Sequence, residues 1–357
     1  MTSTPAAKST LDRAVIVRGR RISDSDPVYI VGEIACGHQG DVAQAKRLIE
    51  AVVKAGADAV QLELFHPPAN LVGSLPFYKV VEDLSFTRDQ WVDVMSFARG
   101  HDTAVSAFVY DDVSMEWALA LKPDMLKLNS SDISNPDLII AAAKSGLPFT
   151  VGTGASSFQE IAEAVDLALA HGGTQMILQH GVQNFPTPTD NAHLRRIAML
   201  KEAFGGLVMY ADHTDASLDM ARYLDLAAIG VGAALLEKHV VLDRAAKGVD
   251  WEAALDPAGF AAYVTTMRAG WRALGPERLM PPTEGDEKYR RFQKKSIVAA
   301  KDIPAGTTLN RSHVAFLRAQ GTAQGLSPMR FRDIAGSKTR RAIAKWEQIV
   351  LTDLETP

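Results

Sequence analysis

The sequence holds a single cysteine, Cys36, among 357 residues. This scarcity excludes a disulfide framework and favours a reducing compartment. No apolar run approaches the roughly 18–20 residues that a membrane-spanning helix needs. The first nine residues are rich in Ser, Thr and Ala and lack the apolar core of a signal peptide. We therefore expect a cytoplasmic protein that does not interact with a membrane.

The chain as a whole also lacks an excess of positive charge, because its formal net charge is -4. The charge is unevenly distributed, however. Residues 288–357 contain 14 Lys and Arg against 5 Asp and Glu, a net charge of +9, which leaves -13 for the rest. A basic module on an acidic body can be a docking device, an anion-binding lid or a nucleic-acid arm. The tail shows no recognisable nucleic-acid motif, so we favour the lid and expect no nucleic-acid partner.

Short apolar runs alternate with longer segments whose apolar residues recur at helical spacing. The runs lack strict alternation of polar and apolar residues, which is typical of strands buried on both faces in a parallel sheet. The predicted strands are Val28–Ile34, Ala57–Phe65, Thr103–Tyr110, Asp124–Asn129, Pro148–Gly152, Gln175–His180, Gly206–Ala211 and Ala233–His239. Eight strand–helix units predict an α/β fold, a (β/α)8 TIM barrel.

The eighth helix is expected over Pro257–Leu274, and the pattern changes after it. A segment rich in Pro, Gly and charge reads as a linker. Short strands are then expected at Ser296–Ala300 and Ala342–Ile343 among turns, which predicts a small β-rich domain. The predicted organisation is an N-terminal extension (1–27), a barrel (28–275), a linker (276–293) and a β-rich domain (294–357).

Polar residues cluster where the predicted strands end, and TIM barrels carry their chemistry at the carboxyl ends of the strands. These strand ends supply Glu33, His38, Gln61, Glu63, Ser106, Lys127, Ser130, Asp132, Thr153, His180, Gln183, Asp212, His213, Thr214, Glu237, Lys238 and His239. We interpret this ring as a catalytic rim.

His213 and His239 close the seventh and eighth strands, which are neighbours in a closed barrel. Both imidazoles can therefore reach one ion, and imidazole suits Mn²⁺, Zn²⁺ or Fe²⁺. With only two histidines, we expect a metal that keeps open positions or water ligands. The alternative is that one of them is a hydrogen-bonded structural histidine.

Lys127 lies inside a predicted buried strand, where an ammonium is costly unless it is paired with an anion. That anion is either a phosphate or carboxylate ligand, or a structural partner such as Asp132 or Glu33. Two further features stay open in the same way. His180 is a third metal ligand or a core histidine, and Gly152-Thr153-Gly154 is a phosphate cradle or a tight turn.

The motifs resemble, in the same order, those of the sialic acid (nonulosonate) synthases. The resemblance covers nearly the whole chain, from about residue 17 to residue 355, and the tail is similar to the antifreeze-like SAF domain that ends those enzymes. The matching segments are Glu33-Ile34-Ala35-Cys36-Gly37-His38-Gln39-Gly40, Lys127-Leu128-Asn129-Ser130-Ser131-Asp132, Phe185-Pro186-Thr187-Pro188, Ala211-Asp212-His213-Thr214, Glu237-Lys238-His239, Gly248-Val249-Asp250 and Lys301-Asp302-Ile303-Pro304-Ala305-Gly306.

This resemblance implies an enzyme that joins phosphoenolpyruvate to the open-chain aldehyde of an N-acylated amino sugar. The product is a 2-keto-3-deoxy nonulosonic acid. The implied cofactor is Mn²⁺ or Mg²⁺ on His213 and His239, and the implied assembly is a domain-swapped homodimer. The remaining implied roles are catalysis for Glu33, His213 and Asp250, donor binding for Lys127 and Ser130, hydrogen bonding to sugar hydroxyls for Asp132 and Asp250, and an arginine contributed to the partner's barrel for Arg318.

Four departures from the pattern fall on the phosphoenolpyruvate side. Gln61 replaces a phosphate-binding lysine, Ala107 a threonine, Gln183 an asparagine and Ala211 a serine. Glu63 stands where the pattern has glutamine. By their positions in the pattern, Gln61, Glu63 and Gln183 are still expected to bind substrate. Each lost contact to a phosphate is worth on the order of 1–3 kcal/mol. The alternatives are therefore a divergent paralogue with a changed donor or aldehyde, or a non-catalytic regulatory protein that binds a sugar or phosphate.

Overall fold

The computed structural model describes residues 10–276, 278–319 and 325–355. The chain divides into two compact units, residues 1–275 and 276–357. The first nine residues of the predicted N-terminal extension lie outside the described residues. Within the described residues, no helix combines the length and the apolar composition that a membrane span requires.

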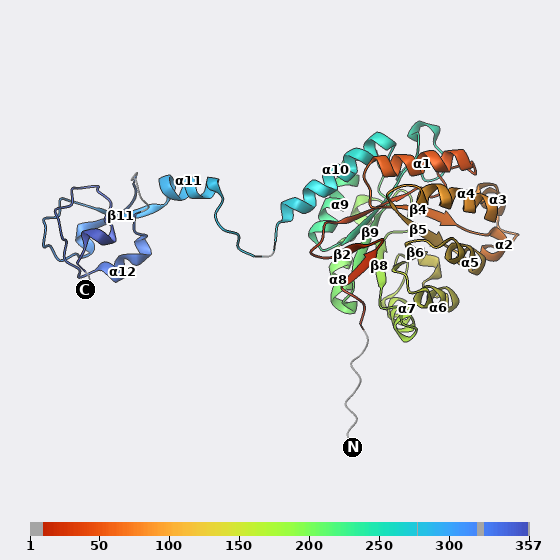
Figure 1. The fold of residues 1–357 in the computed structure, drawn as a ribbon, viewed down its shortest axis with the longest axis horizontal. Helices are drawn as coiled ribbons and strands as arrows, with labels where there is room; N and C mark the ends of the chain where they lie inside the picture. Colours follow the sequence, from red (N-terminus) through yellow and green to blue (C-terminus); the bar gives the residue numbers. More distant parts are fainter. Residues whose placement is uncertain (1–9, 277, 320–324, 356–357) are drawn as a thin grey trace, which may run out of the picture. The chain divides into compact units, whose positions relative to one another are not determined.

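Eight parallel strands close the first unit into a barrel, which confirms the predicted fold class (Figure 1). Each predicted strand is present, with bounds that differ by at most two residues, and β10 pairs with both β9 and β3. The strands are β3 (Tyr29–Glu33), β4 (Ala59–Leu64), β5 (Ala104–Val109), β6 (Met125–Leu128), β7 (Phe149–Gly152), β8 (Met176–Gly181), β9 (Val208–Asp212) and β10 (Leu235–His239).

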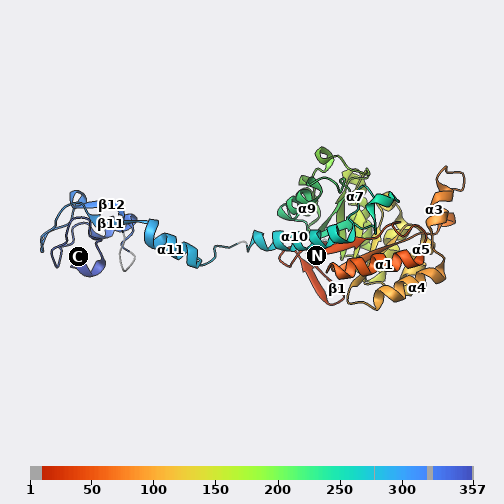
Figure 2. The same ribbon diagram turned by 90° about the horizontal axis from the view of Figure 1, so that it is seen from above.

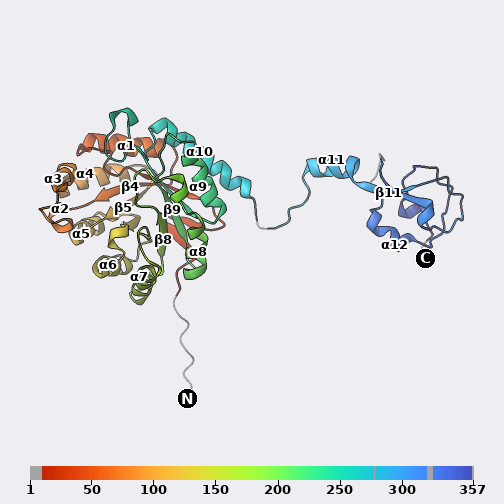
Figure 3. The ribbon, with the colours of Figure 1, turned by 180° about the vertical axis from the view of Figure 1, so that it is seen from behind.

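Helices surround this barrel, as the views from opposite sides show (Figures 1 and 3). In α1, the buried side chains Ala45, Leu48, Ile49 and Val52 recur every three or four residues, so one apolar face packs inward. The helices of this unit are α1 (Val42–Lys54), α2 (Pro67–Asn70), α3 (Tyr78–Leu84), α4 (Arg88–Arg99), α5 (Asp112–Leu121), α6 (Pro136–Ser145), α7 (Phe158–Ala170), α8 (Arg195–Phe204), α9 (Met220–Gly230) and α10 (Pro257–Leu274).

A hairpin precedes the barrel, where the sequence predicted only an extension. Its strands are β1 (Ala14–Val17) and β2 (Arg20–Ser23), paired antiparallel. Val15, Val17 and Ile22 are buried in one cluster with side chains from the amino ends of the barrel strands. Figure 2 labels β1, the first strand of this hairpin. The hairpin therefore belongs to the core that fills the end of the barrel opposite to the predicted rim.

The second unit contains α11 (Glu284–Gln293), β11 (Lys295–Ala299), β12 (Val314–Arg318) and α12 (Phe331–Ile334). Strands β11 and β12 pair antiparallel, and isolated bridges join the turns around them. The predicted strand at Ser296–Ala300 corresponds to β11. The predicted strand at Ala342–Ile343 is reduced to one bridge between Ile343 and Ile303. A separate apolar core of side chains such as Ile297, Leu309 and Ile349 makes this unit a domain of its own.

Candidate active site

A cavity of about 220 Å³ lies at the carboxyl ends of the barrel strands, where the catalytic rim was predicted. All eight strands contribute to its lining. The predicted site residues in this lining are Glu33, Glu63, Lys127, Ser130, Gln183, His213, His239 and Asp250.

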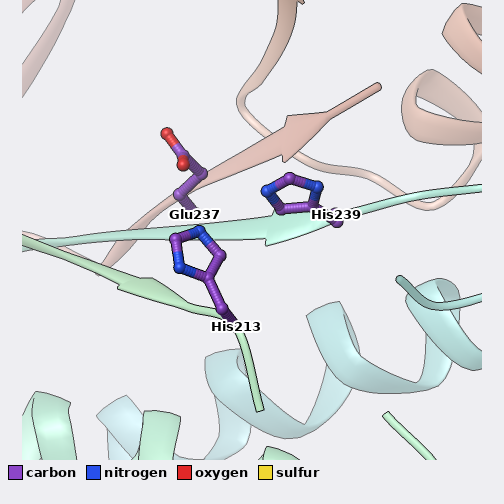
Figure 4. A group of neighbouring side chains, drawn as sticks. All are labelled: His213, Glu237 and His239. Atoms are coloured by element: carbon purple, nitrogen blue, oxygen red, sulfur yellow. The ribbon is translucent and has the colours of Figure 1, made fainter. Parts of the chain in front are cut away.

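The two predicted metal ligands lie side by side, with ring centroids 5.3 Å apart (Figure 4). His213 Nδ1 is 2.9 Å from the carbonyl oxygen of Val182. A carbonyl can only accept, so Nδ1 carries the proton and Nε2 keeps its lone pair. His239 Nδ1 is buried, and it has no hydrogen-bond partner among the described residues. Each ring thus offers a nitrogen that a cation can use.

Burial keeps both rings neutral. It lowers the pKa of His213 below its ordinary value. It lowers the pKa of His239 further, and the His213 ring beside it adds to the effect. A neutral imidazole is the form that ligates a metal. The histidine pair is therefore in its ligating form at neutral pH.

Glu237 completes a potential ligand set that the sequence reasoning did not assign. Ligand atoms of His213, Glu237 and His239 lie within 4.8 Å of one another. Figure 4 shows Glu237 and His239 on the same strand, two residues apart. Side chains two positions apart on a strand point to the same face, so the strand pattern carried this signal. The carboxylate of Glu237 is, however, already engaged by another residue.

That residue is Lys127, whose Nζ lies 2.7 and 2.8 Å from the two carboxylate oxygens of Glu237. Glu33 is a looser partner, with Oε2 at 3.6 Å from Nζ. Asp132 is not a partner of Lys127, which corrects that alternative. The ammonium also stands over the ring of Phe108, 3.9 Å from its centroid. Lys127 thus has a structural anion and still lines the cavity.

Glu33 ends β3 and is almost completely buried. Its Oε1 accepts a hydrogen bond from the Ala35 N–H at 2.9 Å. Burial raises the pKa of Glu33 to about 8; the Lys127 ammonium opposes this rise, and the Glu237 carboxylate adds to it. Glu33 therefore carries a proton at neutral pH and is able to donate it.

Gln61 lies beneath the cavity, fully buried, and does not line it. Its amide nitrogen donates to Glu33 Oε2 and, at 2.8 Å, to Glu237 Oε2. Its amide oxygen accepts from Ser106 Oγ at 2.9 Å. Gln61 thus orients the two carboxylates around Lys127, which is a supporting position for a residue that was predicted to bind substrate.

Two residues further along β4, Glu63 accepts a hydrogen bond from the hydroxyl of Tyr110. Burial raises the pKa of Glu63 above its ordinary value. Asp250 lies in the loop after β10, with Oδ2 at 4.0 Å from His239 Nδ1. Burial, followed by the charge of Glu63, raises the pKa of Asp250 to about 7. Asp250 can therefore exchange a proton with a ligand near neutral pH.

Ser130 and Gln183 are joined by a hydrogen bond of 3.0 Å from the Gln183 amide to Ser130 Oγ. Ser130 is packed against β7 at Gly152, where an added Cβ would come within 2.2 Å of Ser130 Oγ. Gly152 is therefore needed for this close approach.

Two predicted site residues lie elsewhere. Asp132 is half-buried next to Ser131 and outside the cavity lining. Arg318 belongs to the second unit, where it is exposed at the end of β12.

Two other histidines of the rim are structural. His180 Nε2 lies 2.8 Å from the carbonyl oxygen of Ala192, and its ring stacks on Tyr210. The ring of His38 packs on Phe86, with centroids 4.3 Å apart. Neither lines the cavity. His180 is thus a core histidine and not a third ligand.

A closed (β/α)8 barrel with neutral imidazoles and proton-carrying acids at its carboxyl mouth is the architecture of a TIM-barrel enzyme. The NeuB family model matches residues 48–278, and the SAF domain model matches residues 294–355. The chain belongs to the NeuB family.

Its relatives are named as synthases of sialic acid and related sugars. The chain is 26% identical to N-acetylneuraminate-9-phosphate synthase of Drosophila melanogaster, over 94% of this chain and 97% of that protein. It is 27% identical to pseudaminic acid synthase of Helicobacter pylori, over 92% of this chain and 98% of that protein.

Among solved structures, N-acetylneuraminic acid (sialic acid) synthetase of Leptospira borgpetersenii in complex with citrate has a TM-score of 0.71 and 25% identity. It covers 78% of this chain and 95% of its own. The chain is therefore an enzyme similar to the sialic acid synthases.

Proposed function

We propose that this protein is a metal-dependent synthase that forms a C–C bond between phosphoenolpyruvate and an N-acylated amino-sugar aldehyde. The products are a 2-keto-3-deoxy nonulosonic acid and phosphate. The observation that carries the proposal is the pair of neutral imidazoles beside the Lys127 ammonium in one cavity. Such a site offers a place for a cation and a place for an anion at one mouth of the barrel.

The residues fit a divalent ion, with Mn²⁺ or Mg²⁺ as the proposed identity. His213 is held by the Val182 carbonyl so that Nε2 is available, and His239 Nδ1 is buried without a partner. These nitrogens would hold the ion, and Glu237 would join them if it released Lys127. When bound, the ion would act as a Lewis acid on the aldehyde oxygen.

The anionic donor would lie against Lys127 and Ser130. Lys127 is the one lysine or arginine that lines the cavity within the described part of the chain. Ser130 Oγ accepts from Gln183, so its own proton is free for the donor. Together they would orient the donor carboxylate or phosphate toward the aldehyde carbon.

The acidic residues of the cavity would donate protons and form hydrogen bonds with the substrate. Glu33, with its pKa raised to about 8, would hold a proton on its carboxyl group and give it to the oxygen that becomes a hydroxyl. Asp250, with its pKa raised to about 7, would hydrogen-bond sugar hydroxyls near His239. Asp132 lies outside the lining and has no direct role in this arrangement.

Assembly and location belong to the same proposal. The net charges of +9 on residues 288–357 and -13 on the rest support a homodimer in which each basic domain covers the partner's acidic barrel. Arg318 would then serve the partner's site. The single cysteine supports a reducing compartment such as the cytoplasm.

An assay of phosphate release and keto-acid formation tests the reaction. Purified protein would be given phosphoenolpyruvate and a panel of N-acylated amino sugars, with and without Mn²⁺. We expect equal amounts of phosphate and keto acid, formed only with metal. His239→Ala should lose both turnover and bound metal, measured by metal analysis, whereas His101→Ala, a histidine that does not line the cavity, should keep both. Full metal binding in His213→Ala and His239→Ala would remove the proposed metal site.

A changed donor is the second candidate, and a specific observation favours it. Gln61 is neutral and buried where the family pattern has a phosphate-binding lysine, which leaves Lys127 with its carboxylates as the cation for the donor. If the assay shows no phosphate release with any sugar, the donor is another compound or the protein only binds its ligands. Calorimetry with phosphoenolpyruvate and with the sugars separates these two cases.

A further inference from the structure

A second chamber of about 220 Å³ lies beside the catalytic cavity. It is formed by the end of β4 and by the α2 and α3 segment, which interrupts the regular strand–helix order of the barrel. Glu63 and Tyr110 line both spaces, so these two side chains form the wall between the chamber and the cavity. Nothing in the proposed condensation uses this chamber.

The wall between the two spaces is polar. Tyr110 donates its hydroxyl hydrogen to Glu63 Oε1, and its ring stacks on Phe108 with centroids 4.4 Å apart. Within the described residues, the other oxygen, Glu63 Oε2, accepts only from the thiol of Cys36, at 3.5 Å. Because a thiol is a weak donor, Oε2 keeps capacity for a stronger one such as an amide N–H.

Behind this wall the chamber is apolar. Its side chains include Phe65, Leu71, Phe77, Val81 and Leu84, with Asn70 as the one amide. Phe77 is 50% exposed, so the chamber is partly open to solvent, and a sugar hydroxyl placed against its apolar side chains would lose some of its hydrogen bonds to water. An apolar cavity of about 150 Å³ already accepts a benzene ring, so this chamber has room for an alkyl chain of several carbons.

We propose that the chamber binds the alkyl part of the acceptor's N-acyl group, with the amide N–H on Glu63 Oε2. An N-acyl group is an amide followed by an apolar chain. The Glu63 carboxylate in the wall can accept a hydrogen bond from the amide N–H, and the apolar chamber behind it can hold the chain. The inference rests on the proposed function for the sugar, and it adds a preference for acyl groups longer than acetyl. Val81 and Leu84 are then specificity-determining residues.

Calorimetry on the full-length protein with Mn²⁺ tests this preference. The ligands are 2-amino-2-deoxymannose carrying acetyl, propionyl, butyryl and hexanoyl groups. We expect the dissociation constant to fall roughly fourfold for each added methylene until the chamber is filled, from the transfer free energy of a buried CH₂. An affinity that is independent of chain length, or no measurable binding of any of the four sugars, overturns the proposal.

Val81→Ser and Val80→Ser form a matched pair. Val81 lines the chamber, whereas its neighbour on α3, Val80, is 56% exposed and does not. Val81→Ser should flatten the dependence on chain length, and Val80→Ser should keep it. A larger side chain in Val81→Phe should reject hexanoyl more than acetyl. Equal behaviour of the two serine variants contradicts the inference.

The same measurements separate the two proposals. If acyl length governs binding but no sugar is turned over, the chamber stands and the proposed reaction fails. If phosphate and keto acid form from the acetyl sugar but longer acyl groups bind no better, the reaction stands and the chamber has no role in the acceptor. In that second outcome, the chamber is occupied by another segment of the chain or by a ligand other than the acceptor.

Discussion

Two lysines on barrel strands lie between pairs of carboxylates, and they differ in where they point. Lys127 on β6 points into the barrel, next to Glu237 and Glu33, and keeps 8% of its side chain exposed to the cavity. Lys238 on β10 is completely buried next to Asp212 and, at 3.5 Å, Asp225. The two groups have the same chemistry, so access to the cavity is what distinguishes them.

The buried Lys238 makes more hydrogen bonds than the cavity-facing Lys127. Lys238 Nζ donates to Asp212, to Asp225 and, at 3.1 Å, to the carbonyl of Ala221 on α9. Burial opposes the charge on Asp212, but the Lys238 ammonium outweighs it and holds the pKa of Asp212 below its ordinary value. The ammonium of Lys127 lies at a surface that a ligand reaches. We infer that Lys238 serves stability and that Lys127 serves binding.

The largest effect is expected from Lys238→Met. Removing the ammonium leaves the carboxylate of Asp212 buried without its cation, and Asp225 loses its hydrogen-bond donor. Breaking a buried pair in this way costs about 3–5 kcal/mol of the free energy of unfolding. Urea denaturation measures it, with the exposed Lys144→Met as control, which should stay within about 0.5 kcal/mol of the native protein. A decrease in the free energy of unfolding of less than about 1 kcal/mol would mean that Lys238 and its two acidic partners do not stabilise the fold.

Lys127→Met should show the opposite balance. Its carboxylates face a cavity that water enters, and Glu33 already holds a proton, so we expect a smaller loss of stability than for Lys238→Met. Turnover should suffer more, because a charge-assisted contact to the donor is worth about 1.5–3 kcal/mol, or roughly 10–150-fold in kcat/KM. Steady-state kinetics and urea denaturation of both lysine variants are the measurements. Equal destabilisation of the two variants would abolish the distinction.

Gln61→Lys adds a second cation to the charged residues around Lys127. If phosphoenolpyruvate is the donor, this variant should lower its apparent KM, by about tenfold for each ~1.4 kcal/mol regained. Glu63, which stands where the family pattern has glutamine, is a competitor for the new ammonium, in addition to Glu33 and Glu237, which Gln61 contacts. The double variant with Glu63→Gln tests that competition. An ordinary micromolar KM in the native protein that neither variant improves would refute our account of the donor site.

The smallest effect is expected from Asp225→Asn, and it depends on pH. Burial raises the pKa of Asp225 to about 8, against the opposing charge of Lys238. The folded state therefore holds this proton more tightly than the unfolded state, so stability is lost as pH rises through about 8. Between pH 7 and 9 the native protein should lose on the order of 1 kcal/mol from this group. Asp225→Asn cannot ionise and should lose less over the same range. If the unfolding temperatures of the native protein and of Asp225→Asn change equally between pH 7 and 9, the prediction is wrong.

Much of the fold follows from local patterns. Eight apolar runs predicted the eight strands, because a strand buried on both faces needs apolar side chains at every position. The positions of His213 and His239 at adjacent strand ends predicted that they would meet. The hairpin of β1 and β2 was not predicted. Its few apolar residues have a partner only at the closed end of the barrel, and local periodicity does not record that surface.

The sequence by itself determined the barrel, the mouth that carries the chemistry and the histidine pair, because these depend on strand period and chain order. Only the tertiary structure decided which charges meet. Lys127 and Glu237 are 110 residues apart, and the sequence offered Asp132 and Glu33 as partners of Lys127 without deciding between them. Closure of the barrel brought Glu237 to Lys127 and turned Gln61 beneath both, while Asp132 stayed outside the cavity. Ion pairing depends on distances through space, and a one-dimensional pattern fixes those only among near neighbours.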